Sequence, residues 1–308
     1  MTKWEKEILK SRFKTEKEVI SELENIYTQS LNDVNNKLER LMLRKDRNEK
    51  WVLNRRKYLN ALKTQISETL NTLHSQEFVT IDEYLSGSYH DGFLGTLYVL
   101  QKQGLPFVFP IDAEKVARAV INDSNLSEKL YLKLGKNMSE LKRGINAEIS
   151  RGMINDDSYI QIAEKIEKRH KIGQNRAIRI VRTESNRIYN RASFDVLEDA
   201  KKNGADVFKQ WDATLDKRTR PNHAALDGNI KAYDEPFEIY GYSAMFPGDF
   251  GVAKEDINCR CVILTRAKWA LDDDELATLK KRAEYFGLDK SNSFTEFKKQ
   301  FLKIENFN

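Results

Sequence analysis

Residues 211–228 read WDATLDKRTRPNHAALDG, and they follow the change from a helical to a strand pattern after Gly204. The preceding segment, Val207 to Trp211, is typical of a strand. The chain then turns, and His223 follows on a loop or a short helix. The Asp-Gly pair at 227–228 suits a tight turn into another short strand. We therefore expect a small α+β unit from about 205 to 268, with a further strand over 261–265.

The region before this unit carries helical periodicity. Apolar residues between Ile20 and Leu41 recur at steps of three and four, and residues 59–73 repeat the pattern after a charged stretch at 44–50. Such stripes predict an antiparallel pair of helices with coiled-coil-like packing. We also expect the apolar stripe near the N-terminus to be exposed and to be the surface that contacts a partner protein.

The middle of the chain is expected to be helical as well. Periodicity covers 116–149 with a turn-prone break at 122–125, and two further helices are predicted over 159–169 and 174–202. The last of these ends at Asn203-Gly204, a sequence that commonly terminates helices. The C-terminal residues 272–301 return to helical periodicity.

A change in composition between residues 85 and 110 marks a boundary. Glycine occurs at 87, 92, 95 and 104, which predicts a short helix and then an extended connector. The expected fold is α+β and predominantly α-helical. We divide it into an elongated N-terminal helical region at 1–105, a helical segment with the small α+β unit at 110–268, and a helical tail at 269–308.

Composition limits the class of protein. The chain has 308 residues, of which 40% are hydrophobic and 32% charged, with five prolines and a net charge of +5. These values fit a soluble helical protein and permit attraction to nucleic acid without demanding it. Neither an apolar run of about 20 residues nor a signal peptide is present, so we expect synthesis in a cytoplasm and no membrane partner.

The two cysteines, Cys259 and Cys261, are the best candidate metal ligands. In a strand, residues i and i+2 point to the same side, and a disulfide between them would be strained. Two thiolates with His223 from a neighbouring loop make most of a tetrahedral zinc site. The fourth ligand would be Asp216 or His170. Alternatively, the cysteines are small buried side chains and the histidine bonds within its loop.

Residues 180–187, IVRTESNR, form a polar cluster in the middle of a predicted helix. Glu184, Arg187 and Arg191 are spaced three and four apart, so they share one helix face. They are expected to form a partly buried network of salt bridges against the following strands. Contact of the arginines with an anion or phosphate is the alternative.

A basic run precedes this cluster. It is expected either to be a solvated helix face or to contact the phosphates of double-stranded DNA without sequence specificity. The candidate residues are Lys165, Lys168, Arg169, Lys171, Arg176 and Arg179.

The order of these features resembles the head-morphogenesis domain of the phage Mu F-like family, which includes minor head proteins of siphophages. An R-T-E helix is followed by W-x-A-x-x-D-x-R-T-R-x-x-H, by L-D-G and by N-C-R-C leading into a strand, over about residues 110–268. Beside the candidate metal ligands, the residues that carry the resemblance are Arg182, Thr183, Glu184, Arg187, Trp211, Arg220, Asp227, Gly228 and Asn258.

The resemblance implies a structural function in a virion. Such a protein is a minor capsid component, taken into the procapsid near the portal vertex through contacts with the portal, the scaffold or the major capsid protein, and assisting DNA packaging or ejection. It would be in the host cytoplasm during assembly and inside the head afterwards. Some family members carry C-terminal toxin domains, whereas about 40 residues follow the motifs here, which is too few for one.

We expect no catalytic residues and no certain cofactor, so the chain is predicted not to be an enzyme. A metal-dependent nuclease is the catalytic alternative, in which His223, Asp216, Arg220 and Glu184 would be the acid/base and phosphate-binding groups. A DNA-binding protein without sequence specificity is the other alternative.

Overall fold

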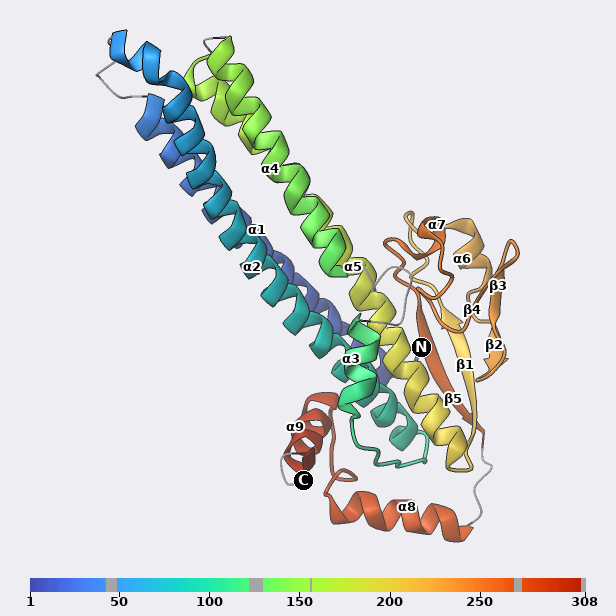
Figure 1. Cartoon of the computed structure of the whole chain (residues 1–308). Helices are drawn as coiled ribbons and strands as arrows, with labels where there is room; N and C mark the ends of the chain where they lie inside the picture. The colour runs from blue at the N-terminus through green and yellow to red at the C-terminus, as the bar shows by residue number, and fades with distance from the viewer. Residues whose placement is uncertain (43–48, 122–129, 156, 269–272, 306–308) are drawn as a thin grey trace. The chain divides into compact units, whose positions relative to one another are not determined.

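The computed structural model describes residues 1–42, 49–121, 130–155, 157–268 and 273–305 (Figure 1). The fold is α+β and mostly helical, as the sequence predicts. The helices are α1 (Lys3–Met42), α2 (Glu49–Lys102), α3 (Ala113–Ile121), α4 (Leu130–Ile154), α5 (Tyr159–Lys202), α6 (Pro221–Ala225), α7 (Ala253–Asp256), α8 (Asp273–Tyr285) and α9 (Phe294–Glu305). The strands are β1 (Asp206–Asp212), β2 (Ile230–Ala232), β3 (Phe237–Ile239), β4 (Tyr242–Ala244) and β5 (Val262–Lys268).

Two compact units make up the chain, and each is assembled from separate stretches. Unit 1 comprises Met1–Glu16, Tyr84–Glu128 and Val181–Asn308, and unit 2 comprises Lys17–Glu83 and Lys129–Ile180. The three regions expected from the sequence, 1–105, 110–268 and 269–308, remain a prediction. In the part of the chain that the structure describes, no helix is both long and apolar enough to cross a membrane.

Unit 2 contains the helical pair that the N-terminal periodicity predicts. Tyr27 of α1 donates a hydrogen bond to Glu77 of α2 at 2.8 Å, and Thr80 lies 3.3 Å from Glu22, so the two helices run antiparallel. The expectation of an exposed apolar stripe is wrong, because Leu23, Tyr27, Val34 and Leu38 are buried in this unit. Their burial stabilises the pair by roughly 1.5–3 kcal/mol for each large apolar side chain. Leu41 is outside the residues whose side chains are described.

Helices α4 and the first half of α5 complete unit 2. The expected break between 169 and 174 is absent, and one helix continues through Gly173. A Cβ atom at this position would lie 3.3 Å from Leu141 and 3.4 Å from Tyr27, so the glycine lets neighbouring helices approach closely. Its carbonyl oxygen accepts a hydrogen bond from Asn137 at 3.0 Å. The predicted turn at 122–125 lies outside the described residues.

Helix α2 extends further than the sequence predicts. Glycines 87, 92 and 95 all lie inside it, and the extended connector begins only after Gly104. At Gly92 the glycine allows α2 to pack closely against α5 within unit 1. A Cβ atom at this position would lie 2.4 Å from the carbonyl oxygen of Tyr189 in α5. Tertiary packing therefore outweighs the low helix propensity of glycine.

The sheet of unit 1 has the order β2-β1-β5, and all of its pairs are antiparallel. Trp211 of β1 pairs with Ile263 of β5. The second half of α5 covers this sheet (Figure 1), and Asn190 accepts a hydrogen bond from the backbone nitrogen of Ile263 at 3.0 Å. A separate hairpin, β3-β4, follows β2 in the chain. This arrangement brings the loop before β5 against α5 and α6.

The C-terminal tail is helical, as predicted, and consists of α8 and α9. Phe297 of α9 is buried, and its ring centroid lies 5.4 Å from that of Tyr98 in α2. Lys102 donates a hydrogen bond to the carbonyl oxygen of Ser291 at 2.8 Å. The tail is thus packed as part of unit 1.

Candidate metal centre

His223, Cys259 and Cys261 lie together, as the sequence predicts. The Nδ1 atom of His223 is 3.6 Å from the Sγ atom of Cys259 and 3.5 Å from the Sγ atom of Cys261. All three side chains are buried, with exposed fractions of 1 to 3%. Their ligand atoms lie within 4.8 Å of one another, so the group could hold a metal ion.

The separations suit one particular coordination geometry. In a tetrahedral zinc site, Zn–S bonds of about 2.3 Å and Zn–N bonds of about 2.0–2.1 Å place the sulfur and nitrogen ligand atoms roughly 3.5 Å apart. The two Sγ–Nδ1 distances, 3.5 and 3.6 Å, match this value. Two thiols and an imidazole are also ligands that zinc prefers.

Helix α6 and the 258–261 loop position the three groups. His223 lies in α6, which begins at Pro221, a residue well suited to the first turn of a helix. Asn258 has a φ of 55°, in the left-handed region that asparagine tolerates better than most residues. Its backbone nitrogen donates a hydrogen bond to the hydroxyl of Thr183 in α5 at 3.1 Å. The R-T-E helix is thereby joined to the N-C-R-C loop.

Two asparagines of α5, which sequence reasoning missed, hold the same loop. The side-chain amides of Asn186 and Asn190 each donate a hydrogen bond to the carbonyl oxygen of Cys261 at 3.1 Å. Both residues are buried and are four apart, so they share one helix face. That spacing, directly after the R-T-E residues, is the only indication of their role in the sequence.

Glu255 was also missed, and it contacts the other side of the imidazole. Its carboxylate lies 3.1 Å from the Nε2 atom of His223 and accepts a hydrogen bond from Asn222 at 2.8 Å. Arg220 donates to the carbonyl oxygens of Glu255 and Ile257 at 3.2 and 2.5 Å. A carboxylate on the remote nitrogen of a histidine ligand is common in metal sites, where it orients the ring.

The protonation of the group is shifted toward an ion pair. The pKa of Cys259 is well below its usual value, because hydrogen bonds from Cys261 and His223 outweigh the effect of burial. The pKa of Cys261 is raised, because its thiol bonds to Cys259 and is buried. Burial lowers the pKa of His223, but the hydrogen bond and charge of Cys259 raise it further than burial lowers it. A thiolate is the form in which cysteine binds metal.

Neither predicted fourth ligand belongs to the buried group. Asp216 is paired with Arg260, at 2.6 and 2.5 Å between the carboxylate oxygens and the guanidinium nitrogens. The pKa of Asp216 is held below its usual range, first by that bond and then by the backbone nitrogen of Arg218. His170 lies in unit 2, where its ring is 3.5 Å from the hydroxyl of Ser30. In the nuclease hypothesis Asp216 and His223 act as acid and base. Asp216 is bound to Arg260 and His223 to Glu255, so both groups already have partners.

The tryptophan and Asp-Gly motif residues shape the loop around α6. Trp211 is fully buried, and its ring centroid lies 5.7 Å from that of His223, edge to face. Asp227 accepts a hydrogen bond from the backbone nitrogen of Ala213 at 2.7 Å. Gly228 has a φ of 78° and donates from its backbone nitrogen to the carbonyl oxygen of Trp211 at 2.9 Å. The tight turn predicted at 227–228 is present.

The polar cluster of α5 contains a buried ion pair. Arg187 lies 3.0 Å from Glu184, and both side chains are at most 2% exposed. Arg187 also donates to the carbonyl oxygen of Ala119 at 2.7 Å. Arg191 pairs with Asp195 at 2.9 Å. This geometry is that of the expected salt-bridge network, and the anion-binding alternative does not fit Arg187.

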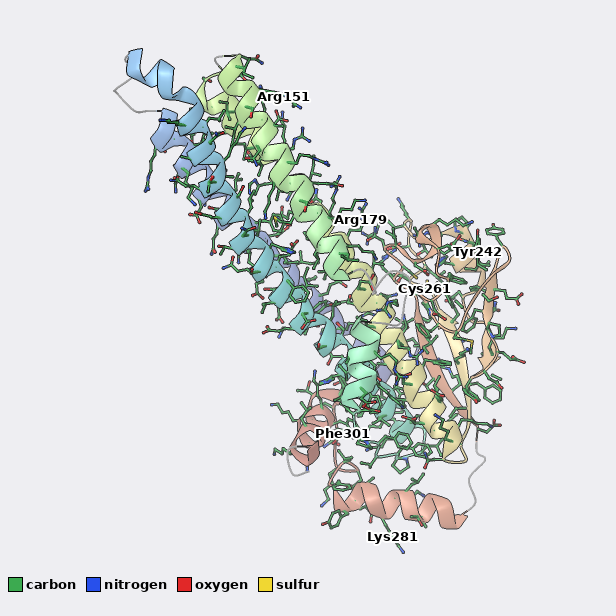
Figure 2. The ribbon with its side chains drawn as sticks, viewed as in Figure 1. Arg151, Arg179, Tyr242, Cys261, Lys281 and Phe301 are labelled. Carbon is green, nitrogen blue, oxygen red and sulfur yellow. The ribbon has the colours of Figure 1, made fainter. Side chains whose placement is uncertain are left out.

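The predicted DNA-binding residues lie on α5 in unit 2. Three of them have carboxylate partners, namely Lys165 with Asp157, Arg169 with Glu148 and Arg176 with Glu140. Lys171 bonds to Gln174 at 2.8 Å. Lys168 and Arg179 are exposed, and Arg179 and Arg151 are seen among the side chains of this unit in Figure 2.

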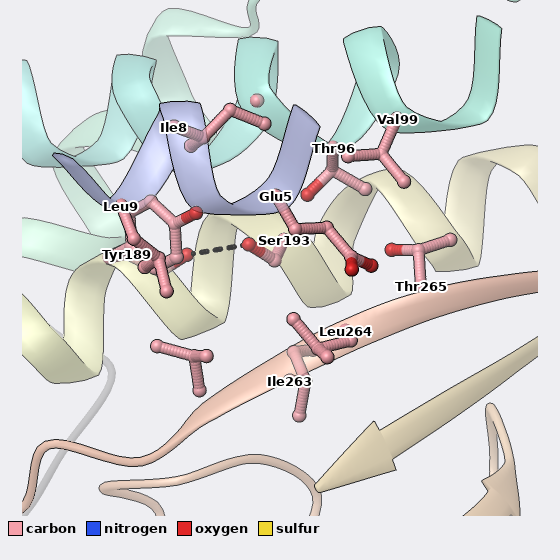
Figure 3. A pocket seen from close by; sticks show the side chains of 12 residues that line it. Glu5, Ile8, Leu9, Thr96, Val99, Tyr189, Ser193, Ile263, Leu264 and Thr265 are labelled. Atoms are coloured by element: carbon pink, nitrogen blue, oxygen red, sulfur yellow. Dashed lines mark hydrogen bonds between the residues drawn. The ribbon is translucent and has the colours of Figure 1, made fainter. Parts of the chain in front are cut away.

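A small cavity lies elsewhere in unit 1, between α1, α2, α5 and β5 (Figure 3). Its volume is about 20 Å³, enough for about one water molecule. Ser193, on its wall, donates a hydrogen bond to the carbonyl oxygen of Tyr189 at 3.0 Å. The cavity is too small for a ligand.

Comparison with known proteins identifies relatives of this chain. The family model described as Phage Mu protein F like protein matches residues 143–264. The chain is 31% identical over 268 residues to the NAD(+)–arginine ADP-ribosyltransferase EFV of Enterococcus faecalis, an alignment that covers 86% of this chain and 54% of that protein. It is 32% identical over 212 residues to the minor head protein GP7 of Bacillus phage SPP1, which covers 68% of this chain and 67% of that protein. No solved structure matches.

Proposed function

Because this chain belongs to the phage Mu protein F-like family and is a homologue of the minor head protein GP7 of Bacillus phage SPP1, we propose that it is a minor head protein that is incorporated into the procapsid through contacts with the portal or scaffold protein. The observation that carries the proposal is the alignment with GP7, which covers two thirds of both proteins. The contacts of Thr183, Asn186 and Asn190 with the 258–261 loop support it, because they lie within the segment that the family model matches.

The test is a binding experiment with the portal oligomer of the phage that encodes the chain. The two proteins, both treated with nuclease, are mixed at physiological salt and examined by size-exclusion chromatography. Co-migration is the expected result. If the chain fails to co-migrate with the portal in repeated trials but co-migrates with scaffold or major capsid protein, that protein is the partner instead of the portal. Failure with all three would contradict the head-protein role.

We propose that the buried His223 group holds a structural zinc ion. The match of the two Sγ–Nδ1 distances to a tetrahedral site supports this, as does the carboxylate of Glu255 on Nε2. When bound, zinc would tie α6 to the start of β5, and the thiol of Cys261 and the Nδ1 atom of His223 would lose their protons to solvent.

Elemental analysis of the purified protein tests the zinc proposal. We expect about one zinc per chain in the wild type and a large loss in Cys259→Ala, with Cys261→Ala as a second ligand variant. Ser291→Ala, which removes a buried polar group elsewhere in unit 1, is the control. A wild-type protein without zinc after purification at neutral pH, and after addition of zinc, would contradict the proposal.

We further propose contact with double-stranded DNA through the exposed face of α5 in unit 2. Lys168 and Arg179 support it, since both are exposed, whereas the carboxylate partners of three other candidates reduce the net positive charge there. Binding should weaken as salt rises, because phosphate contacts release counterions. The double variant Lys168→Gln with Arg179→Gln should weaken DNA binding. Lys202→Gln, which also replaces a charged side chain but lies in unit 1, is the control and should not. Binding that does not depend on salt would contradict the proposal.

We propose that the chain acts by binding rather than by catalysis. One relative is named an ADP-ribosyltransferase, but the alignment spans about half of that protein, and GP7 aligns to the same chain. Both ring nitrogens of His223 have partners, which is consistent with a structural role. Transfer of ADP-ribose from NAD⁺ to arginine, or Mg²⁺-dependent DNA cleavage lost in His223→Ala, would refute this.

A further inference from the structure

A cavity in unit 1 has a wall rich in arginine. Its volume is about 560 Å³, and five of its ten lining residues are arginines while one is a carboxylate, Glu16. The arginines come from α1, α5 and the two loops that carry the family motifs, and they are Arg12, Arg182, Arg218, Arg220 and Arg260. Side chains far apart in the sequence therefore converge on one space of a size typical for ligands.

Two of these arginines have no carboxylate partner among the described residues. Arg12 is 5% exposed, and it donates to the side-chain oxygen of Asn186 at 2.7 Å. Its Nε atom is enclosed and meets no acceptor in the described part of the chain. Arg220 donates only to the carbonyl oxygens of Glu255 and Ile257. Arg12 is thus a buried charge with neutral partners, which is costly, whereas Arg220 is half-buried, and an anion here would stabilise the protein.

The other three arginines share two carboxylates. Arg182 pairs with Glu16 at 3.3 Å, and Arg260 and Arg218 both pair with Asp216, at 2.5 and 3.7 Å. Five cations against two carboxylates leave an excess of three positive charges. A thiolate at Cys259, which also lines the cavity, leaves the excess positive. Positive charge in a partly enclosed cavity attracts anions more strongly than the same charge on an open surface.

The chemistry of the wall favours phosphate over a carboxylate. A carboxylate offers two oxygens in one plane, which one guanidinium can satisfy. A phosphate group is tetrahedral, offers three or four oxygens and can carry up to two charges, so it suits several guanidinium groups that approach from different elements. Arginine is the only basic residue type in the wall, as is common where phosphate is bound through paired hydrogen bonds.

We propose that this cavity is a binding site for a phosphate group, with Arg12, Arg182 and Arg220 as its main contacts. The phosphate belongs either to a free nucleotide or similar small molecule or to the backbone of a single-stranded nucleic acid. The site is distinct from the α5 face of unit 2, and it does not depend on the proposed incorporation into a phage head.

The test is calorimetric titration of the full chain with inorganic phosphate, with AMP and with a short oligothymidylate, and polyglutamate is the non-phosphate anion. Arg12→Gln and Arg182→Gln should each weaken binding about tenfold, the loss expected for one charged hydrogen bond. Lys202→Gln removes the same charge from the same unit at a side chain paired with Glu198, away from the cavity wall, and should change binding by less than about twofold.

The outcomes separate the sources and decide the proposal. Binding of inorganic phosphate or AMP, lost in the cavity variants, supports a small phosphate ligand, and binding of the oligothymidylate alone supports nucleic acid. The proposal is overturned if no phosphate probe binds, if polyglutamate alone binds, or if all three variants weaken binding equally. Arg182 is half exposed, so its variant decides the matter if Arg12→Gln does not fold.

Discussion

The carboxylate of Glu255 lies 3.1 Å from the Nε2 atom of His223, while Nδ1 of the same ring faces the two cysteine sulfurs. The carboxylate therefore fixes which nitrogen is offered to a metal. This relationship gives the first prediction.

Glu255→Gln is expected to weaken zinc binding by about 10- to 100-fold, the usual effect of losing a carboxylate that orients a histidine ligand. Competition with a chromogenic chelator measures the affinity. Glu238→Gln, at an exposed position of β3, should leave it unchanged. Equal affinity in the wild type and in Glu255→Gln would show that the carboxylate does not orient the ring.

Gly92→Ala should destabilise unit 1. The added Cβ would lie 2.4 Å from the carbonyl oxygen of Tyr189, so the backbone must shift, at a cost of about 1–3 kcal/mol. Gly87 lies in the same helix with open space around it, and Gly87→Ala should stabilise by about 0.5–1 kcal/mol. Urea unfolding followed by circular dichroism compares the two variants. A Gly92→Ala midpoint at or above that of the wild type would contradict the close helix contact.

Glu184→Gln should cost about 3–5 kcal/mol, because it leaves the buried guanidinium of Arg187 without its carboxylate. Glu198→Gln is the control. It breaks an exposed pair with Lys202 in the same helix and should cost less than about 1 kcal/mol. Similar losses of unfolding free energy in both variants would mean that the buried pair Glu184–Arg187 stabilises the protein no more than the exposed pair Glu198–Lys202 does.

His170 should make unit 2 sensitive to acid. Burial lowers its pKa to about 4, against 6.5 when the chain is unfolded. Between these values the unfolded state binds more protons, so stability is full above pH 6.5 and is lost as pH falls toward 4, by at most about 1.4 kcal/mol per pH unit. His170→Gln should lessen this loss in urea unfolding at a series of pH values. Parallel pH profiles for variant and wild type would refute the assignment.

The sequence predicted that Cys259 and Cys261 lie together as candidate metal ligands, because their spacing is local. Cys259 and Cys261 are two apart in the chain, and rare residue types at short spacing are informative. Glu255 could not be recognised in this way. It is one of many glutamates, it lies in a four-residue helix, and only the tertiary fold brings it to His223, which is 32 positions away.

Helix boundaries were predicted less well than helix positions. Gly92 suggested the end of a short helix, and a break was expected between 169 and 174, yet Gly92 and Gly173 each lie inside a helix where a neighbouring helix comes close. Local propensity gives no information on such contacts. Likewise, an apolar stripe shows that a helix has a partner, but not that the partner is in the same chain, as it is for Leu23 and Val34.

The interleaving of the two units bears on how the chain acquires its structure during translation. Unit 2 needs residues up to Ile180, and unit 1 needs the first sixteen residues together with the last part of the chain. A nascent chain that stops at Ile180 therefore contains the whole of unit 2 but leaves buried apolar residues of α2, such as Phe93 and Leu97, without the second half of α5 and without β5. Neither unit corresponds to one continuous fragment, so no single cut divides the chain into the two units. Unit 1 can therefore form only after α5 and β5 have been made, when the first residues of α1 meet the strand β5.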